Sequence, residues 1–202
     1  MKLDRIIAVR NHKTVYRDGE LCMKVFDETY SKADILAEAM NQARVEETGL
    51  HIPQVREVTV IDGKWTIMPD YINVKTLAQL MEDHPENKND WLNLFVDLQL
   101  EVQSKTCPLL PKLRDKMDRK ISLTDFDATT RYELHTRLDS CPKHAKLCHG
   151  DFNPSNIIIS EDGTPYILDW AHASQGNASA AVAATYLQFW LAGDIDGAAR
   201  YL

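Results

Sequence analysis

Alternating apolar and polar positions dominate the first part of the chain and predict short strands separated by tight turns. An apolar run covers residues 5–10, extended character resumes over 14–17, and a third strand is expected over 20–26. The polar segments Asn11-His12-Lys13 and Asp18-Gly19 are turn candidates. This part of the chain therefore predicts three consecutive strands connected by hairpins.

A helical pattern follows these strands. Ser31 and Asp34 form a capping-box signal at its start, and Gly49 marks its end. Two further strands, 58–61 and 64–68, flank Asp62-Gly63, which strongly favours a two-residue hairpin. The order of elements predicts a five-stranded antiparallel sheet with one helix.

The pattern becomes mainly helical from residue 91 onward. Residues 91–104 have an amphipathic pattern whose apolar side is formed by Leu92, Phe95, Leu98 and Val102. Further helices are expected over 109–121 and 129–138. Residues 180–191 are apolar around nearly the whole circumference of a helix, so this helix needs cover on every side. We therefore expect part of it to be exposed or covered by a second copy, as in a homodimer.

Composition indicates a cytoplasmic protein that binds neither nucleic acid nor membrane. The net charge of the 202 residues is −7, and no basic stripe runs along the sequence. The first five residues, Met1-Lys2-Leu3-Asp4-Arg5, lack the apolar core of a signal peptide. The longest apolar stretch, 180–192, is too short to span a bilayer. Without an export signal, the cysteines (Cys22, Cys107, Cys141 and Cys148) are expected to be reduced thiols.

The most informative segment runs from His149-Gly150-Asp151 to Asn156 and is followed by Asp169. It contains H-x-D-x-x-x-x-N, the spacing of a kinase catalytic loop, in which the Asp accepts the hydroxyl proton and the Asn holds a metal ion. A hairpin pattern separates Asn156 from Asp169 and predicts that the two are neighbours in space. Their oxygen atoms suit Mg2+, which takes few protein ligands.

Two other interpretations of this region remain open. The spacing of Cys141, His144, Cys148 and His149 is also compatible with a zinc site. The HGD segment could also be a chance turn between two core strands. We favour the catalytic loop, in which His149 supports the loop by hydrogen bonding and Cys148 lies on the buried strand before it.

The segment from Leu147 to Trp170 resembles the Brenner-type motif of the aminoglycoside phosphotransferase and choline kinase family, small-molecule relatives of the protein kinases. Protein kinases themselves match less well, because Gly150 and Asn153 stand where their loop usually has Arg and Lys. The resemblance implies an α+β, bilobal, protein-kinase-like fold. Its N-terminal nucleotide-binding lobe would cover 1–70, and its helical C-terminal lobe, with the catalytic loop and metal site, would cover 71–202.

The resemblance also implies a nucleotide site in the N-terminal lobe. Lys24 stands at the place of the strand-three lysine that contacts the α- and β-phosphates, and Cys22 would line the adenine pocket. Glu38, which shares a helix face with Gln42, is expected to hold Lys24 in position. Met68 and Asp70, at the start of the segment that would join the lobes, are assigned to the same site. Glu46 and Glu47 compete with Glu38 but lie near the helix end.

The expected function is a phosphotransferase that uses ATP or GTP with Mg2+ and acts on a hydroxyl of a small molecule. Catalysis would rest on Asp151 and His149, and metal binding on Asn156 and Asp169. Departures from the family suggest an alternative, a catalytically weak or inactive nucleotide-binding regulatory protein. Relatives commonly have Asp at the place of Ala181, often Arg at Ala184 and His at Gln103, and further helices beyond Leu202. The segment 10–19 contains one glycine, so it offers no glycine-rich loop.

Overall fold

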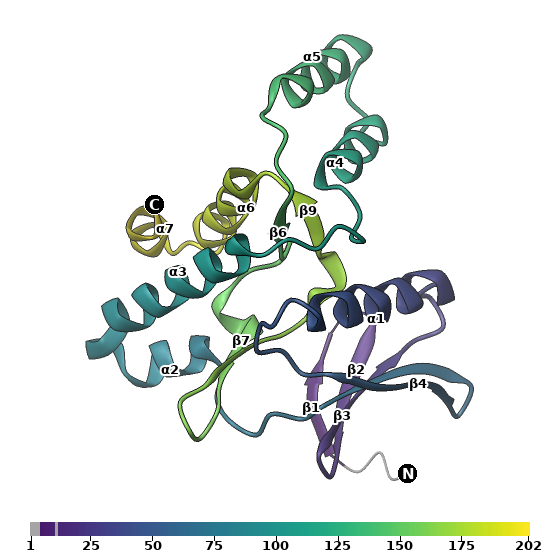
Figure 1. The fold of residues 1–202 in the computed structure, drawn as a ribbon, viewed down its shortest axis with the longest axis vertical. Coiled ribbons are helices and arrows are strands. Elements are labelled where there is room, and N and C mark those ends of the chain that lie inside the picture. Colours follow the sequence, from purple (N-terminus) through teal and green to yellow (C-terminus); the bar gives the residue numbers. More distant parts are fainter. Residues whose placement is uncertain (1–4, 11) are drawn as a thin grey trace. The chain divides into compact units, whose positions relative to one another are not determined.

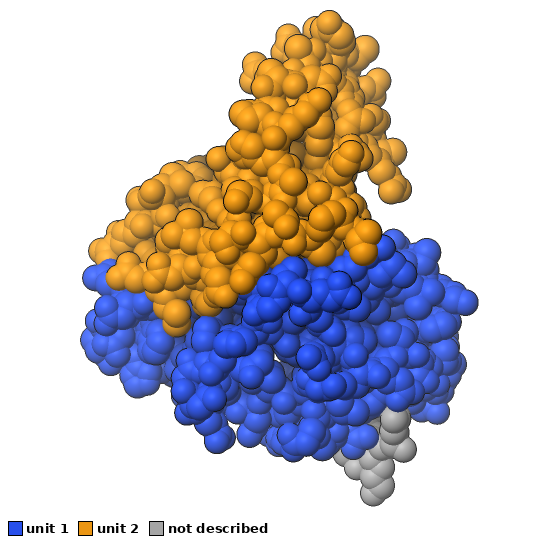
Figure 2. Space-filling view, viewed as in Figure 1, with its two compact units in different colours: residues 1–91, 153–172 blue, residues 92–152, 173–202 orange. Residues whose placement is uncertain are grey.

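The computed structural model describes residues 5–10 and 12–202, so Asn11 of the first expected turn lies outside the described residues. The chain forms two compact units (Figure 2). The first unit combines Met1–Trp91 with Asn153–His172, and the second combines Leu92–Phe152 with Ala173–Leu202. These units are not the expected lobes 1–70 and 71–202, and that lobe boundary stays a prediction.

A five-stranded antiparallel sheet forms the first part of unit 1 (Figure 1). Its strands, in spatial order, are β1 (Arg5–Val9), β2 (Lys13–Asp18), β3 (Leu21–Phe26), β5 (Lys64–Pro69) and β4 (Val55–Ile61). The turn between β4 and β5 is made by Asp62 and Gly63, with φ values of 48° and 79°. Positive φ at both central residues is the type I′ hairpin geometry, so the predicted sheet and hairpin are confirmed.

Helix α1 (Lys32–Glu46) packs on one face of this sheet. Ser31 caps it by accepting a hydrogen bond from the Asp34 amide, as the capping pattern predicted. The core under the helix consists of Phe26, Ile35, Ala39 and Ile67. Met23, Val25 and Met68 form a separate buried cluster. Alternation along β3 and β5 divides the apolar side chains between these two clusters.

Residues far along the chain complete unit 1. The predicted hairpin is present as β7 (Ile157–Ile159) and β8 (Pro165–Ile167). The turn Trp170–His172 packs against α1, where Asn41 donates a hydrogen bond to the Ala171 carbonyl at 3.1 Å. The sequence analysis missed α2 (Leu77–Asp83), whose capping box pairs Thr76 with Gln79.

Unit 2 is mainly helical. It contains most of α3 (Lys88–Ser104), then α4 (Leu113–Ser122), α5 (Ala128–Ser140), α6 (Ala178–Leu191), α7 (Ile195–Tyr201), and the paired strands β6 (Lys146–Cys148) and β9 (Ser174–Gly176). The helix expected over 109–121 begins only at Leu113, because Pro108 and Pro111 occur in the preceding turn and lack backbone donors. The short α7 and β9 were not predicted.

An aromatic cluster in the core of unit 2 includes Phe152 of the catalytic-loop motif. The Phe95 ring lies 4.7 Å from that of Phe152, measured between centroids, and 5.7 Å from that of Phe189. Tyr201, on α7, packs against Phe95 and Phe189 and donates its hydroxyl proton to Gln99. Phe152 therefore packs on α3 through Phe95, and the rings from α6 and α7 pack on Phe95 in turn.

Helix α6 leaves part of its apolar surface exposed. Leu187 is 48 % exposed, Trp190 51 % and Leu191 76 %, so the all-round apolar pattern did indicate an incompletely covered helix. Self-association through this surface stays a prediction. Within residues 5–10 and 12–202, none of the helices combines the length and apolarity needed to cross a bilayer.

Candidate active site

A cavity of about 610 Å³ lies within unit 1. It is lined by residues from the first three strands, from α2, and from the segments around the β7–β8 hairpin. Among its lining residues are five of the predicted site residues, namely Cys22, Lys24, Asp70, Asn156 and Asp169. The fold thus brings together side chains that are far apart in sequence.

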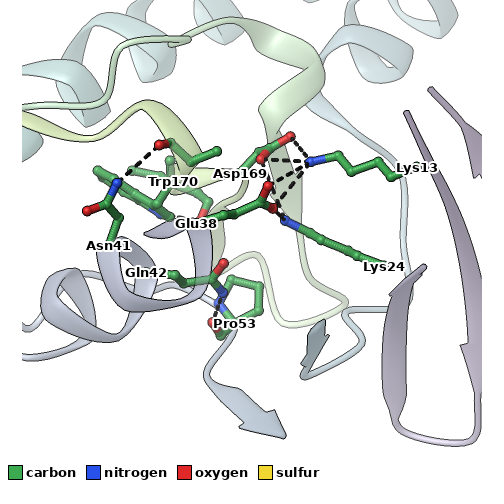
Figure 3. A network of polar contacts seen from close by, with 10 residues as sticks. Lys13, Lys24, Glu38, Asn41, Gln42, Pro53, Asp169 and Trp170 are labelled. Atoms are coloured by element: carbon green, nitrogen blue, oxygen red, sulfur yellow. Dashed lines mark hydrogen bonds and ion pairs between the residues drawn. The ribbon is translucent and has the colours of Figure 1, made fainter. Parts of the chain in front are cut away.

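Lys24 and Glu38 form the ion pair that the sequence led us to expect (Figure 3). The Lys24 ammonium lies 2.9 Å from Glu38 Oε1, and the two side chains are only 12 % and 3 % exposed. Burial alone would lower the pKa of the Lys24 amine, but the negative charges of Asp169 and Glu38 outweigh it and raise that pKa above its ordinary value. Lys24 therefore stays protonated at neutral pH and is suited to contact an anionic ligand.

Asn156 and Asp169 are brought together by the β7–β8 hairpin, as predicted. Ile157 pairs with Ile167, and the Leu168 amide donates to the Asn156 carbonyl at 2.8 Å. The backbone of Asp169 has a φ of 60°, in the left-handed region that side-chain-bearing residues seldom adopt. Such a conformation costs about 1 kcal/mol or more and concentrates at functional sites.

A second lysine at this site was missed by the sequence analysis. Lys13 Nζ lies 3.3 Å from each oxygen of Asp169 and 3.3 Å from Glu38 Oε1 (Figure 3). The β2–β3 register pairs Lys13 with Phe26 and Val15 with Lys24. Directly paired residues share a face of the sheet, so this register was the signal that could have placed Lys13 beside Lys24.

Of the predicted nucleotide-site residues, Met68 lies away from the cavity, and Asp70 is held in an ion pair at its edge. Met68 is fully buried against Met23 and Val25 and does not line the cavity, because alternation along β5 turns its side chain toward that cluster. Asp70 lines the cavity, but its carboxylate accepts a hydrogen bond of 2.7 Å from Arg56. Its side chain thus fixes the end of β5 against β4.

The catalytic-loop motif belongs partly to unit 2, which contains His149 and Asp151. His149 is 2 % exposed, and its Nδ1 accepts the Asp151 amide proton at 3.2 Å. Between them, Gly150 has a φ of 87°, which explains why glycine stands where protein kinases have Arg. Thr185 donates to the Phe152 carbonyl at 3.0 Å. The loop is therefore supported by its own histidine and by α6, although Ala181 cannot support it.

Gln188 on α6 is a further polar residue at this loop that the sequence did not indicate. Its Nε2 donates to Asp151 Oδ1 at 2.7 Å. A small cavity of about 10 Å³ is lined by Gln188 together with Gln103, His149, Gly150 and Ala181. Of the described residues, none pairs with Gln103 Nε2 or with Gln188 Oε1, which are both buried.

Replacing Gln188 with leucine is expected to reduce turnover about tenfold, because the Asp151 carboxylate loses a hydrogen bond that orients it. The melting temperature should change little, since leucine also removes the buried, unpaired Oε1. Steady-state kinetics and thermal melting measure both effects. Unchanged turnover at an unchanged melting temperature would show that Gln188 does not position Asp151.

The zinc interpretation receives no geometric support. Across the part of the chain that the structure describes, no group of three or more His, Cys, Asp or Glu residues is placed to hold a metal ion. Cys148 lies buried on β6, and burial raises its thiol pKa to about 11, whereas Cys141 is exposed at the end of α5.

Comparison with known proteins decides the family. Residues 8–201 match the profile of the family described as "Phosphotransferase enzyme family" (APH). The chain belongs to this family. Membership makes it a small-molecule phosphotransferase and confirms the family expected from the motif between Leu147 and Trp170. No curated protein sequence matches the chain significantly.

Solved structures agree on the fold of this phosphotransferase. It is 18 % identical to a thermostable mutant of aminoglycoside phosphotransferase APH(4)-Ia in its apo form, with a TM-score of 0.70, over 97 % of this chain and 76 % of that one. The ternary complex of such a mutant with AMP-PNP and hygromycin B is 18 % identical to this chain, with a TM-score of 0.65. The match covers 92 % of this chain and 71 % of that one. Choline kinase LicA from Streptococcus pneumoniae is 16 % identical, with a TM-score of 0.61. The match covers 100 % of this chain and 75 % of that one. These similarities confirm the predicted α+β, protein-kinase-like fold.

Proposed function

We propose that this phosphotransferase moves the γ-phosphoryl group of ATP or GTP, with Mg2+, to a hydroxyl of a small molecule. The observation that carries the proposal is the ion-paired group of Lys24, Glu38 and Asp169, of which Lys24 and Asp169 line the 610 Å³ cavity. A cavity of this size is within the range of small-molecule and cofactor sites. Its cationic and anionic side chains are those that phosphates and a bound metal ion would require.

The proposed nucleotide site uses the charges of unit 1. Lys24, kept protonated by Asp169 and Glu38, would contact the phosphates, and Glu38 would hold its ammonium extended toward them. Cys22 would lie beside the base or sugar, because it is two residues before Lys24 on the cavity side of β3. The AMP-PNP complex of APH(4)-Ia supports nucleotide binding as a property of this fold.

The residues present also suit Mg2+. Asp169 offers a carboxylate and Asn156 an amide oxygen, and both line the cavity. Mg2+ prefers hard oxygen donors and usually completes its coordination with water and phosphate. When bound, the ion would neutralise charge on the phosphates, while Asp169 and Asn156 hold it.

Asp151 is the proposed catalytic carboxylate. Gln188 donates a hydrogen bond to its carboxylate, and its own backbone amide donates a hydrogen bond to His149 Nδ1. Together these two hydrogen bonds hold Asp151 in one orientation. It would orient the acceptor hydroxyl and accept its proton. Phosphoryl transfer proceeds through a loose transition state, so positioning and charge neutralisation account for most of the rate.

A phosphotransfer screen tests this function. The purified protein is incubated with γ-labelled ATP or GTP, with and without Mg2+, and with aminoglycosides, choline, homoserine or simple sugars. These acceptors include the compound classes named for its structural relatives. We expect Mg-dependent transfer to one class. If neither nucleotide shifts the melting temperature in the presence of Mg2+, the proposed nucleotide site is wrong.

Alkylation of Cys22 reports on the cavity independently of turnover. Burial raises the pKa of the Cys22 thiol above its ordinary value, despite the nearby charge of Lys24. Less thiolate is therefore present at neutral pH, and iodoacetamide labelling of Cys22 should be slow and accelerate as the pH rises toward that raised pKa. Nucleotide with Mg2+ should protect Cys22 but not the exposed Cys141. Peptide mapping by mass spectrometry measures both, and labelling of Cys22 that nucleotide does not slow would place the nucleotide elsewhere.

A further inference from the structure

Lys13 contacts the same carboxylate oxygens that a metal ion would use. Its ammonium lies 3.3 Å from both Asp169 Oδ1 and Asp169 Oδ2, and 3.3 Å and 3.5 Å from the two oxygens of Glu38. Its side chain is 16 % exposed, and that of Asp169 is 31 % exposed. A cation this close to both oxygens excludes a metal ion from them.

Two lysines balance the charges of the two carboxylates in this cluster. Glu38 and Asp169 contribute two negative charges, and Lys13 and Lys24 contribute two positive ones. A divalent cation added at Asp169 would face both ammonium groups in a partly buried environment, where the repulsion is poorly screened. The four phosphate charges of ATP would compensate that excess. Metal binding at Asp169 should therefore depend on nucleotide.

The attachment of Lys13 permits its ammonium to move while its backbone stays fixed. The backbone at position 13 pairs with Phe26 in the β2–β3 register, and its carbonyl accepts the Arg10 amide at 2.9 Å. The side chain is a flexible four-carbon stem with three rotatable donors. Lys13, Lys24 and Arg10 all line the 610 Å³ cavity, so phosphates there would be within a region of positive charge.

We propose that Lys13 is a competing counter-ion of Asp169 that transfers to the nucleotide phosphates when a metal–nucleotide complex binds. This inference rests on the proposed function and deepens it. Lys13 would thus suppress binding of free metal and add a charged phosphate contact from β2. The segment 10–19 contains one glycine and therefore offers no glycine-rich loop to contact the phosphates. The contact from Lys13 would stand in for that missing loop.

The test compares Lys13→Met with two other variants. Lys13→Arg keeps the charge, and Lys32→Met removes an exposed lysine of the same unit that does not line the cavity. Free Mn2+ is titrated by electron paramagnetic resonance without nucleotide, and ATP binding is measured by calorimetry in EDTA. We expect Lys13→Met to bind Mn2+ about tenfold more tightly and metal-free ATP about tenfold more weakly than the wild type. Lys13→Arg and Lys32→Met should stay close to wild type.

The failure of this inference can be distinguished from failure of the function. If the wild type does not bind ATP with Mg2+, the proposed function is wrong and this inference falls with it. If the wild type binds Mg-ATP but Lys13→Met leaves the affinities for Mn2+ and metal-free ATP unchanged, only the role of Lys13 is wrong. Lys13→Gln repeats the comparison with a neutral side chain that still forms hydrogen bonds, and thermal melting confirms that each variant is folded.

Discussion

Replacing Asp151 with asparagine is expected to reduce turnover by about a thousandfold while leaving nucleotide affinity nearly unchanged. Asparagine keeps the shape of the side chain and can still accept the hydrogen bond from Gln188 at Oδ1. It cannot accept the proton of an attacking hydroxyl, so only the reacting state loses an interaction. Steady-state kinetics measure the turnover, and calorimetry with Mg-ATP measures the affinity.

The matched control for this variant is Asp125→Asn, which changes an exposed carboxylate between α4 and α5 of the same unit. It should leave both quantities unchanged. Near-wild-type turnover of Asp151→Asn would show that another group orients the hydroxyl. A parallel fall in nucleotide affinity would instead indicate that Asp151 supports the fold of its loop, in which its backbone amide donates a hydrogen bond to His149.

Removing the carboxylate of Asp169 is expected to weaken Mg-nucleotide binding by about a hundredfold, or about 2.7 kcal/mol. Binding of metal-free nucleotide should be unchanged or tighter, because Lys13 and Lys24 lose a negative partner and become available to phosphate. Calorimetry with ATP in Mg2+ and in EDTA separates the two effects. An equal loss in both conditions would mean that Asp169 acts on the structure of the site and not on the metal.

The choice of substitution matters at this position because the Asp169 backbone has a φ of 60°. Asparagine tolerates the left-handed region better than alanine does. Asp169→Asn therefore isolates the loss of charge, whereas Asp169→Ala adds backbone strain and should also lower the melting temperature. Glu82→Gln, which changes an exposed carboxylate at the same cavity, is the matched control and should bind Mg-nucleotide normally.

Local signals in the sequence predicted the local structure well. The Ser31 cap and the Asp62-Gly63 turn depend on residues within one turn of helix or one hairpin, and both are present. The Lys24–Glu38 pair could also be inferred, because strand alternation and helix periodicity define the face on which each residue lies. A short hairpin likewise made Asn156 and Asp169 neighbours.

What the sequence did not reveal depends on long-range contacts or on very short elements. Lys13 is separated from Asp169 by 156 positions, and Gln188 from Asp151 by 37, and no local pattern connects such pairs. Strand β9 has three residues and helix α7 has seven, too few to establish a periodicity. Met68 is buried and does not line the cavity, because the direction of its side chain depends on the register of β5 within the sheet.

The first unit is discontinuous along the chain, which has a consequence for synthesis on the ribosome. Its core needs Ile157, Ile167 and Trp170, which are each at most 2 % exposed. The His51 carbonyl accepts the Ile167 amide at 3.0 Å, so the connection after α1 is also completed from the distant segment. The nascent N-terminal sheet therefore emerges long before the residues that close it. Vectorial folding from the N-terminus, common in proteins built of successive domains, is incomplete here until residue 172 has left the exit tunnel.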